Sequence, residues 1–189
     1  MEAFLVAAGI VALAEMGDKT QLLSLVLAAR FRRPWPIVFG IFAATLANHA
    51  LAGALGGWVT HWLGPHVLRW VLGGSFVAMA AWMLIPDKLD EDESAAGAAS
   101  KLGVFGTTLV AFFMAEMGDK TQVATVALAA QYQQWAAVVA GTTLGMLLAN
   151  APVVWFGERL VKKVPIRAVH VISALIFLAL GLAAFFGWG

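Results

Sequence analysis

The sequence contains no cysteine and few charged residues, and both absences narrow what the protein can be. Without cysteine there can be no disulfide, no Cys-ligated zinc or iron–sulfur site and no thiol chemistry. Only 12% of the 189 residues are charged and 61% are hydrophobic, whereas soluble chains carry roughly 25% charged residues. The formal net charge of +1 gives no reason to expect nucleic acid as a partner. The composition therefore predicts an integral membrane protein and argues against a soluble enzyme.

Six apolar stretches are long enough to be membrane spans. They lie at residues 3–29, 35–60, 67–85, 102–130, 135–157 and 168–188. Each is uniformly apolar rather than alternating, and each is longer than the roughly nine to eleven residues of a barrel strand. We therefore predict an all-α polytopic membrane protein with six transmembrane helices. The first stretch follows Glu2 rather than basic residues, so we expect a mature span and not a signal peptide.

One segment of the chain occurs twice. The sequence Ala-Glu-Met-Gly-Asp-Lys-Thr-Gln at residues 14–21 recurs unchanged at residues 115–122. This predicts a duplicated three-helix unit, with repeats at 1–85 and 102–189 joined by an acidic linker at 86–101. Because three is an odd number of crossings, the second repeat must enter the membrane from the opposite face. Inverted repeats of this kind are typical of secondary transporters that work by alternating access.

The basic residues predict the orientation. Nine of them lie in the three loops on one side of the predicted membrane, and Arg69 is the one expected on the other side. Because cytoplasmic loops are enriched in Lys and Arg, we expect these loops in the cytoplasm and both termini outside. The nine are Arg30, Arg32, Arg33, Lys88, Lys101, Arg159, Lys162, Lys163 and Arg167.

Each copy of the motif places charged side chains in the middle of a predicted span. These are Glu15, Asp18 and Lys19 in the first copy and Glu116, Asp119 and Lys120 in the second. Unpaired, the six groups would cost on the order of 15–20 kcal/mol in a bilayer, so they must pair, bind a ligand or be protonated. Four carboxylates and two lysines leave a charge of −2, which one divalent cation neutralises. We expect the acids to bind the cation and the lysines to act as counter-charges.

Other side chains of the motif have two interpretations each. Thr20, Thr121, Gln21 and Gln122 are either metal ligands or interhelical hydrogen-bonding groups. Asn48 and Asn150 recur in the register of the repeat and either complete an oxygen cage or join helices. Met16 and Met117 either supply a thioether that favours Mn²⁺ or pack against neighbours. The glycine that follows each Met allows either close backbone approach or a local break in the helix.

The doubled motif resembles one family of transporters. Glu-x-Gly-Asp-Lys-Thr, present twice in two three-helix halves with an acidic loop between them, is similar to the cation/proton exchangers that include bacterial manganese exporters and Golgi calcium/manganese transporters. The resemblance covers essentially the whole chain. It implies that Glu15 with Asp18, and Glu116 with Asp119, are the essential acids, and that Mn²⁺ or Ca²⁺ is exported in exchange for protons. It also implies a multi-pass protein of the bacterial inner membrane.

Two other functions were weighed against this one. A membrane-embedded, metal-dependent enzyme acting on a lipid pyrophosphate would need Arg, Ser or His beside its acids to hold phosphate, and every Arg lies in a loop or at a span end. An amino-acid exporter would need a cation for the substrate carboxylate and has no use for four acids. We therefore expect a transporter with no resident cofactor, whose partners are a divalent cation and the lipid bilayer, as a monomer or a homodimer.

Overall fold

The computed structural model describes residues 1–85, 102–157 and 165–187, and these form eight helices and no strand. The helices are α1 (Glu2–Glu15), α2 (Lys19–Phe31), α3 (Pro34–Trp62), α4 (Pro65–Trp82), α5 (Gly103–Glu116), α6 (Lys120–Tyr132), α7 (Trp135–Phe156) and α9 (Ile166–Phe186). The prediction of an all-α fold is confirmed. The predicted acidic linker 86–101 and most of the basic loop before α9 lie outside the described residues.

Two of the six apolar stretches are each divided into two helices. The stretch 3–29 forms α1 and α2, and the stretch 102–130 forms α5 and α6. The division falls at the glycine of each motif, where Gly17 has φ +86° and Gly118 has φ +76°. Such positive φ angles end a right-handed helix and are accessible to glycine without steric cost. Of the two interpretations given for the motif glycines, the structure therefore shows the local break in the helix.

Three helices are long and apolar enough to cross a membrane individually. Among the described residues these are α3 with 29 residues, α7 with 22 and α9 with 21. A helix of 14 residues, such as α1 or α5, is only about 21 Å long, which is less than the roughly 30 Å of a hydrocarbon core. Each half-helix therefore needs its continuation to span the bilayer, and six crossings stay a prediction.

The two halves of the chain pack crosswise. Helix α1 packs against α7, and α5 packs against α3. Gly40 of α3 lies against Phe105 and Thr108 of α5, and a Cβ added there would come within 2.7 Å of Thr108 Cβ. At the positions 101 residues away, Gly141 of α7 lies against Phe4 and Ala7 of α1. The repeat seen in the sequence thus extends to the contacts between helices.

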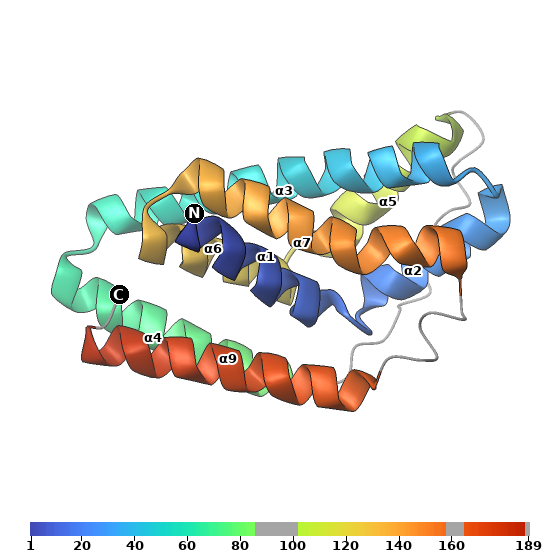
Figure 1. Cartoon of the computed structure of the whole chain (residues 1–189). Coiled ribbons are helices and arrows are strands. Elements are labelled where there is room, and N and C mark those ends of the chain that lie inside the picture. Colours follow the sequence, from blue (N-terminus) through green and yellow to red (C-terminus); the bar gives the residue numbers. More distant parts are fainter. Residues whose placement is uncertain (86–101, 158–164, 188–189) are drawn as a thin grey trace.

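Corresponding helices run in opposite directions. Figure 1 shows α3 and α7 side by side and antiparallel, and α4 and α9 as a second antiparallel pair along one side of the bundle. Within this pair, α9 packs against α1 and α4 packs against α6. Two apolar clusters result. One joins α1 and α6 to the α4–α9 pair, and the other lies among α1, α2, α3, α5 and α7.

Gly141→Ala should destabilise the protein, because the added Cβ would meet the Phe4 carbonyl and lie 3.0 Å from Ala7 Cβ. Overpacking of this kind costs about 1–3 kcal/mol of unfolding free energy. The matched control is Gly9→Ala in α1, whose added Cβ would meet nothing within 4 Å. The control should be neutral or slightly stabilising, since Ala is the better helix former. Thermal unfolding of the detergent-solubilised variants measures both, and equal stabilities would contradict the close α1–α7 crossing.

Candidate metal centre

The two breaks have the same local structure. At the first, Met16 and Asp18 are extended on either side of Gly17, and at the second Met117 and Asp119 flank Gly118 in the same way. Each break is tied to the helix that follows it. The Gly17 N–H donates to Gln21 Oε1 at 3.0 Å, and the Gly118 N–H donates to the equivalent glutamine oxygen at 2.8 Å. Each break is therefore a hydrogen-bonded structure that holds the neighbouring acids in position.

The acids of both halves meet inside the bundle. One carboxylate oxygen each from Glu15, Asp18 and Asp119 lie within 4.8 Å of one another. All three residues are buried, as is Glu116, and none is more than 5% exposed. Because α1 and α2 come from one half and α6 from the other, the cluster forms only when the two halves pack together. The acidic cluster is defined here as Glu15, Asp18, Glu116 and Asp119.

Thr121 connects the members of the acidic cluster. Its hydroxyl oxygen lies 2.7 Å from Glu15 Oε1 and 3.1 Å from Asp119 Oδ2. It also lies 3.2 Å from Glu116 Oε2. A hydroxyl has one proton to donate and two lone pairs, so it can donate to only one of these carboxylates at a time. The repeat-related Thr20 contacts only Glu15, at 2.5 Å. The two threonines of the motif are thus not equivalent.

Each lysine of the motif pairs with the aspartate of the other copy. Lys120 Nζ lies 3.5 Å from Asp18 Oδ1, and Lys19 Nζ lies 3.9 Å from Asp119 Oδ1. Lys120 is buried, and the side chain of Lys19 is only 15% exposed. An ion pair inside an apolar bundle avoids the cost of an isolated buried charge. The crossed pairs therefore join the halves while leaving two carboxylates in excess of the lysines.

The amide side chains lie around the cluster and are used in hydrogen bonds between helices. Gln122 Nε2 donates to Asn48 Oδ1 at 2.6 Å, and Asn48 Nδ2 donates to the Phe113 carbonyl at 3.3 Å. Gln21 Nε2 donates to the Ala149 carbonyl at 3.1 Å. Asn150 Oδ1 accepts a hydrogen bond from Ser24 at 3.0 Å. All four amide side chains therefore join helices, and that they also bind metal stays a prediction.

The structure does not bring the two methionines to the cluster as a pair. The side chain of Met117 is 55% exposed on the surface of the bundle. Met16 is half-buried, and its backbone carbonyl lies 3.1 Å from Nε2 of His170 in α9. A thioether ligand from both halves is therefore not supported.

Three polar contacts near the breaks were not predicted from the sequence. Ser24 and Thr125 lie 101 residues apart, one turn after Thr20 and Thr121, and both are fully buried. The Thr125 hydroxyl donates to the Thr121 carbonyl at 2.7 Å. The sequence could have pointed to Ser24 and Thr125, because each is a hydroxyl residue at a repeat-related position in an apolar helix. The contact of His170 had no such signal, because only the packing of α9 on α1 creates it.

The donor set suits a hard divalent cation. Two ligands on opposite sides of an ion with bonds of about 2.4 Å are separated by about 4.8 Å, so three oxygens that lie within 4.8 Å of one another are close enough to share one ion. Glu116 Oε1 is buried and accepts no hydrogen bond from any described residue. Carboxylates and hydroxyls are the ligands that Mn²⁺, Ca²⁺ and Mg²⁺ prefer. A dication at this position would neutralise the charge of −2 left by the lysines.

Comparison with known proteins gives a consistent result. The family model described as "Divalent cation/proton antiporter GDT1" matches residues 3–91 and 104–188. A protein of Vibrio cholerae named "Putative manganese exporter" is 55% identical over 179 residues, which cover 93% of this chain and 86% of that protein. A GDT1-like protein of Synechocystis sp. is 27% identical over 186 residues, 89% of each chain. No solved structure matches the chain.

Thr121→Val should weaken cation binding more than Thr20→Val. The exchange removes a hydroxyl that contacts three carboxylates from both halves at Thr121 but only one carboxylate at Thr20. Each exchange removes one donated hydrogen bond to a charged group, worth about 1.5–3 kcal/mol, so we expect each to raise the Kd for Mn²⁺ by about tenfold or more, with the larger increase at Thr121, where carboxylates of both halves converge. Calorimetric titration of the purified proteins measures this. Equal loss in the two variants would show that the unequal contacts have no effect on binding.

Proposed function

Because this chain belongs to the GDT1 family of divalent cation/proton antiporters, we propose that it exports Mn²⁺ in exchange for protons by alternating access around the acidic cluster. The family is one of membrane transporters and not of enzymes, so the lipid-pyrophosphate enzyme is excluded. Its substrates are divalent cations, which also sets aside the amino-acid exporter. The observation that carries the proposal is the convergence of carboxylates from both repeats, 101 residues apart, in one buried cluster.

The choice of Mn²⁺ is supported by the relative of Vibrio cholerae, whose name assigns it manganese. The ligand chemistry of the site is less selective, because carboxylate and hydroxyl oxygens bind Ca²⁺ as well. Met117 is not placed to add selectivity, since its side chain is exposed. Transport of Mn²⁺, Ca²⁺, Mg²⁺ and Fe²⁺ into proteoliposomes would rank the ions, and we expect Mn²⁺ to be preferred.

Exchange follows from charge balance in an apolar surrounding. With a dication bound, four carboxylates, two lysines and the ion sum to zero. When the ion leaves, two protons restore the same sum if they bind the same carboxylates. An empty, unprotonated cluster carries two uncompensated charges in the bundle and is therefore disfavoured. In this mechanism the cation and the protons compete for the same acids, and no separate proton pathway is required.

Alternating access is supported by the unequal surroundings of the two breaks. Gly17 lies directly against Ile166 of α9, whereas a Cβ on Gly118 would meet nothing within 4 Å. His170 of α9 also contacts the Met16 carbonyl at the first break. In a transporter of two similar repeats, a structure in which one break is covered and the other is not represents one of two states. In the other state the second break is covered and the first is not. We propose that the α4–α9 pair and the other helices of the two repeats rock relative to each other to make this exchange.

Glu116→Gln should abolish Mn²⁺ transport driven by a pH gradient, because it removes a carboxylate that must bind either the cation or a proton. The matched control is Glu2→Gln, which removes an exposed glutamate at the start of α1. Uptake of Mn²⁺ into proteoliposomes with an imposed pH gradient is the measurement. We expect at least a hundredfold loss for Glu116→Gln and none for the control. Transport by Glu116→Gln at the rate of the unaltered protein would remove the acidic cluster as the transport site.

Inverted topology gives a second prediction, at positions that the repeat makes equivalent. Arg32 and Gln133 are 101 residues apart, both are exposed, and both end a broken pair of helices with φ near +50°. Since the chain has no cysteine, Arg32→Cys and Gln133→Cys each introduce a single thiol. A membrane-impermeant maleimide should label Gln133→Cys in intact cells and Arg32→Cys only after permeabilisation. Labelling of both from the same side would exclude an inverted repeat.

A further inference from the structure

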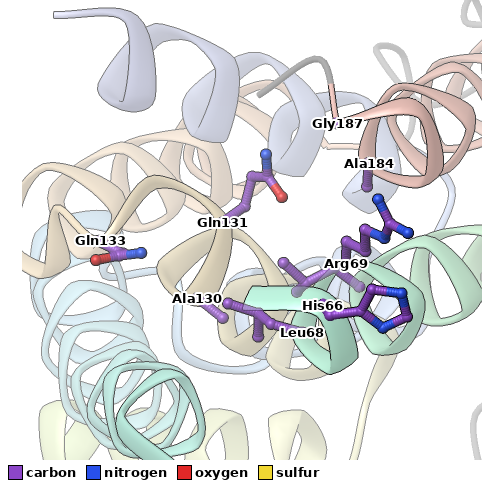
Figure 2. A pocket seen from close by; sticks show the side chains of 9 residues that line it. His66, Leu68, Arg69, Ala130, Gln131, Gln133, Ala184 and Gly187 are labelled. Atoms are coloured by element: carbon purple, nitrogen blue, oxygen red, sulfur yellow. The ribbon is translucent and has the colours of Figure 1, made fainter. Parts of the chain in front are cut away.

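One hollow of the molecule lies away from the acidic cluster. It has a volume of about 410 Å³ and is bounded by the start of α4 and by the ends of α6 and α9 (Figure 2). His66 and Arg69 line it from the first turns of α4, and Gln131 and Gln133 line it from the end of α6. The remaining wall is largely apolar, and Leu68 and Leu72 contribute to it. The hollow therefore combines hydrogen-bond donors with an apolar surface.

Arg69 has no acidic partner within the described residues. Its only contact there is with a ring, since the guanidinium carbon lies 5.7 Å from the centroid of Trp70. Its Nε is shielded from solvent and has no hydrogen-bond partner in that part of the chain. Figure 2 shows Arg69 and Gln131 approaching the hollow from facing elements, with His66 next to Arg69. A guanidinium has five N–H donors and is charged at all physiological pH values, so this group is set to bind an anion.

The hollow lies at an end of the bundle where aromatic residues are exposed. Trp58 and Trp62 end α3, Trp70 lies in the second turn of α4, and all three are more than half exposed. Exposed tryptophans of this kind are typical of the boundary between lipid headgroups and hydrocarbon. An amphiphile at this depth would place its headgroup beside Arg69 and its chains along the apolar wall. The location and the lining therefore point to the same class of ligand.

We propose that this hollow binds the phosphate group of an anionic phospholipid. Arg69 supplies the charge, because guanidinium–phosphate pairs form strong, geometrically specific hydrogen bonds. The side-chain amide of Gln131, which faces Arg69 across the hollow, donates to a remaining phosphate oxygen, and the apolar residues contact the acyl chains. A divalent cation is not the ligand we propose, because the described residues that line the hollow include Arg69 and no acidic side chain. The site is independent of the proposed exchange at the acidic cluster.

The bound lipid would join the two halves of the chain. Arg69 belongs to the first repeat, whereas the residues of α6 and α9 that line the hollow belong to the second. Because α4 packs on both α6 and α9, a lipid held among the three helices favours the arrangement in which they are in contact. The lipid should therefore stabilise the state described here.

Thermal unfolding of the full chain in detergent tests the proposal, with intrinsic tryptophan fluorescence as the readout. The three probes are phosphatidylglycerol, phosphatidylcholine and inorganic phosphate, each added to the unaltered protein and to variants. A ligand that binds only the folded state raises Tm with its concentration. We expect phosphatidylglycerol to raise Tm, and we expect Arg69→Gln to weaken its binding by about tenfold or more. The matched control is Arg30→Gln, which removes an exposed arginine that lies over an aromatic ring in the same way, 5.4 Å from the centroid of Phe31.

The three probes separate the possible outcomes. A Tm increase with phosphatidylglycerol alone that is lost in Arg69→Gln supports a lipid ligand, and the same increase with inorganic phosphate supports the phosphate chemistry with a soluble source. An equal effect of phosphatidylcholine, or equal effects on Arg69→Gln and Arg30→Gln, would overturn the proposal, as would no shift with any probe. If Arg69→Gln does not fold, Gln131→Leu and native mass spectrometry of co-purified lipid provide the same comparison.

Discussion

Neutralising charge in an apolar bundle is the constraint on which the rest of the structure depends. The six charged side chains of the two motifs lie in the interior, and the crossed pairs of Lys120 with Asp18 and Lys19 with Asp119 compensate part of their charge. Because each of these pairs takes one member from each half, packing of the two halves against each other brings opposite charges together. The motifs still contain two more carboxylates than lysines. Folding and the proposed cation binding therefore involve the same set of side chains.

The breaks at Gly17 and Gly118 make this arrangement geometrically possible. In an unbroken helix the backbone polar groups would be used within the helix, and the acids would follow its fixed periodicity. The break turns each Asp into the residue that precedes a new helix, while the preceding Glu ends the old one. The glutamine one turn later accepts a hydrogen bond from the glycine N–H that the break exposes. The identity of the two copies of the motif thus has a local structural reason as well as a chemical one.

The symmetry of the halves is close at the backbone and incomplete in the side chains and their surroundings. Gly40 and Gly141 make repeat-related contacts, yet Thr121 reaches three carboxylates where Thr20 reaches one. The α4–α9 pair covers the first break through Ile166, whereas no described residue lies within 4 Å of a Cβ placed on Gly118 at the second. A transporter of two similar halves needs such a difference, because a fully symmetric molecule would present its site equally to both sides of the membrane.

The sequence by itself determined the all-helical class, the apolar stretches and the positions of the acids, because hydropathy and an eight-residue identity are properties of the chain alone. It left open whether the glycines break the helices and whether the glutamines and asparagines bind metal. Only the tertiary structure decided the first question, gave the amide side chains their hydrogen-bond partners on other helices and showed that each Lys faces the Asp of the other copy. The physical reason is that these partners are set by how α1 and α2 pack against α5 and α6. Spacing along the chain fixes which face of a helix a residue occupies, but not what the helix meets there.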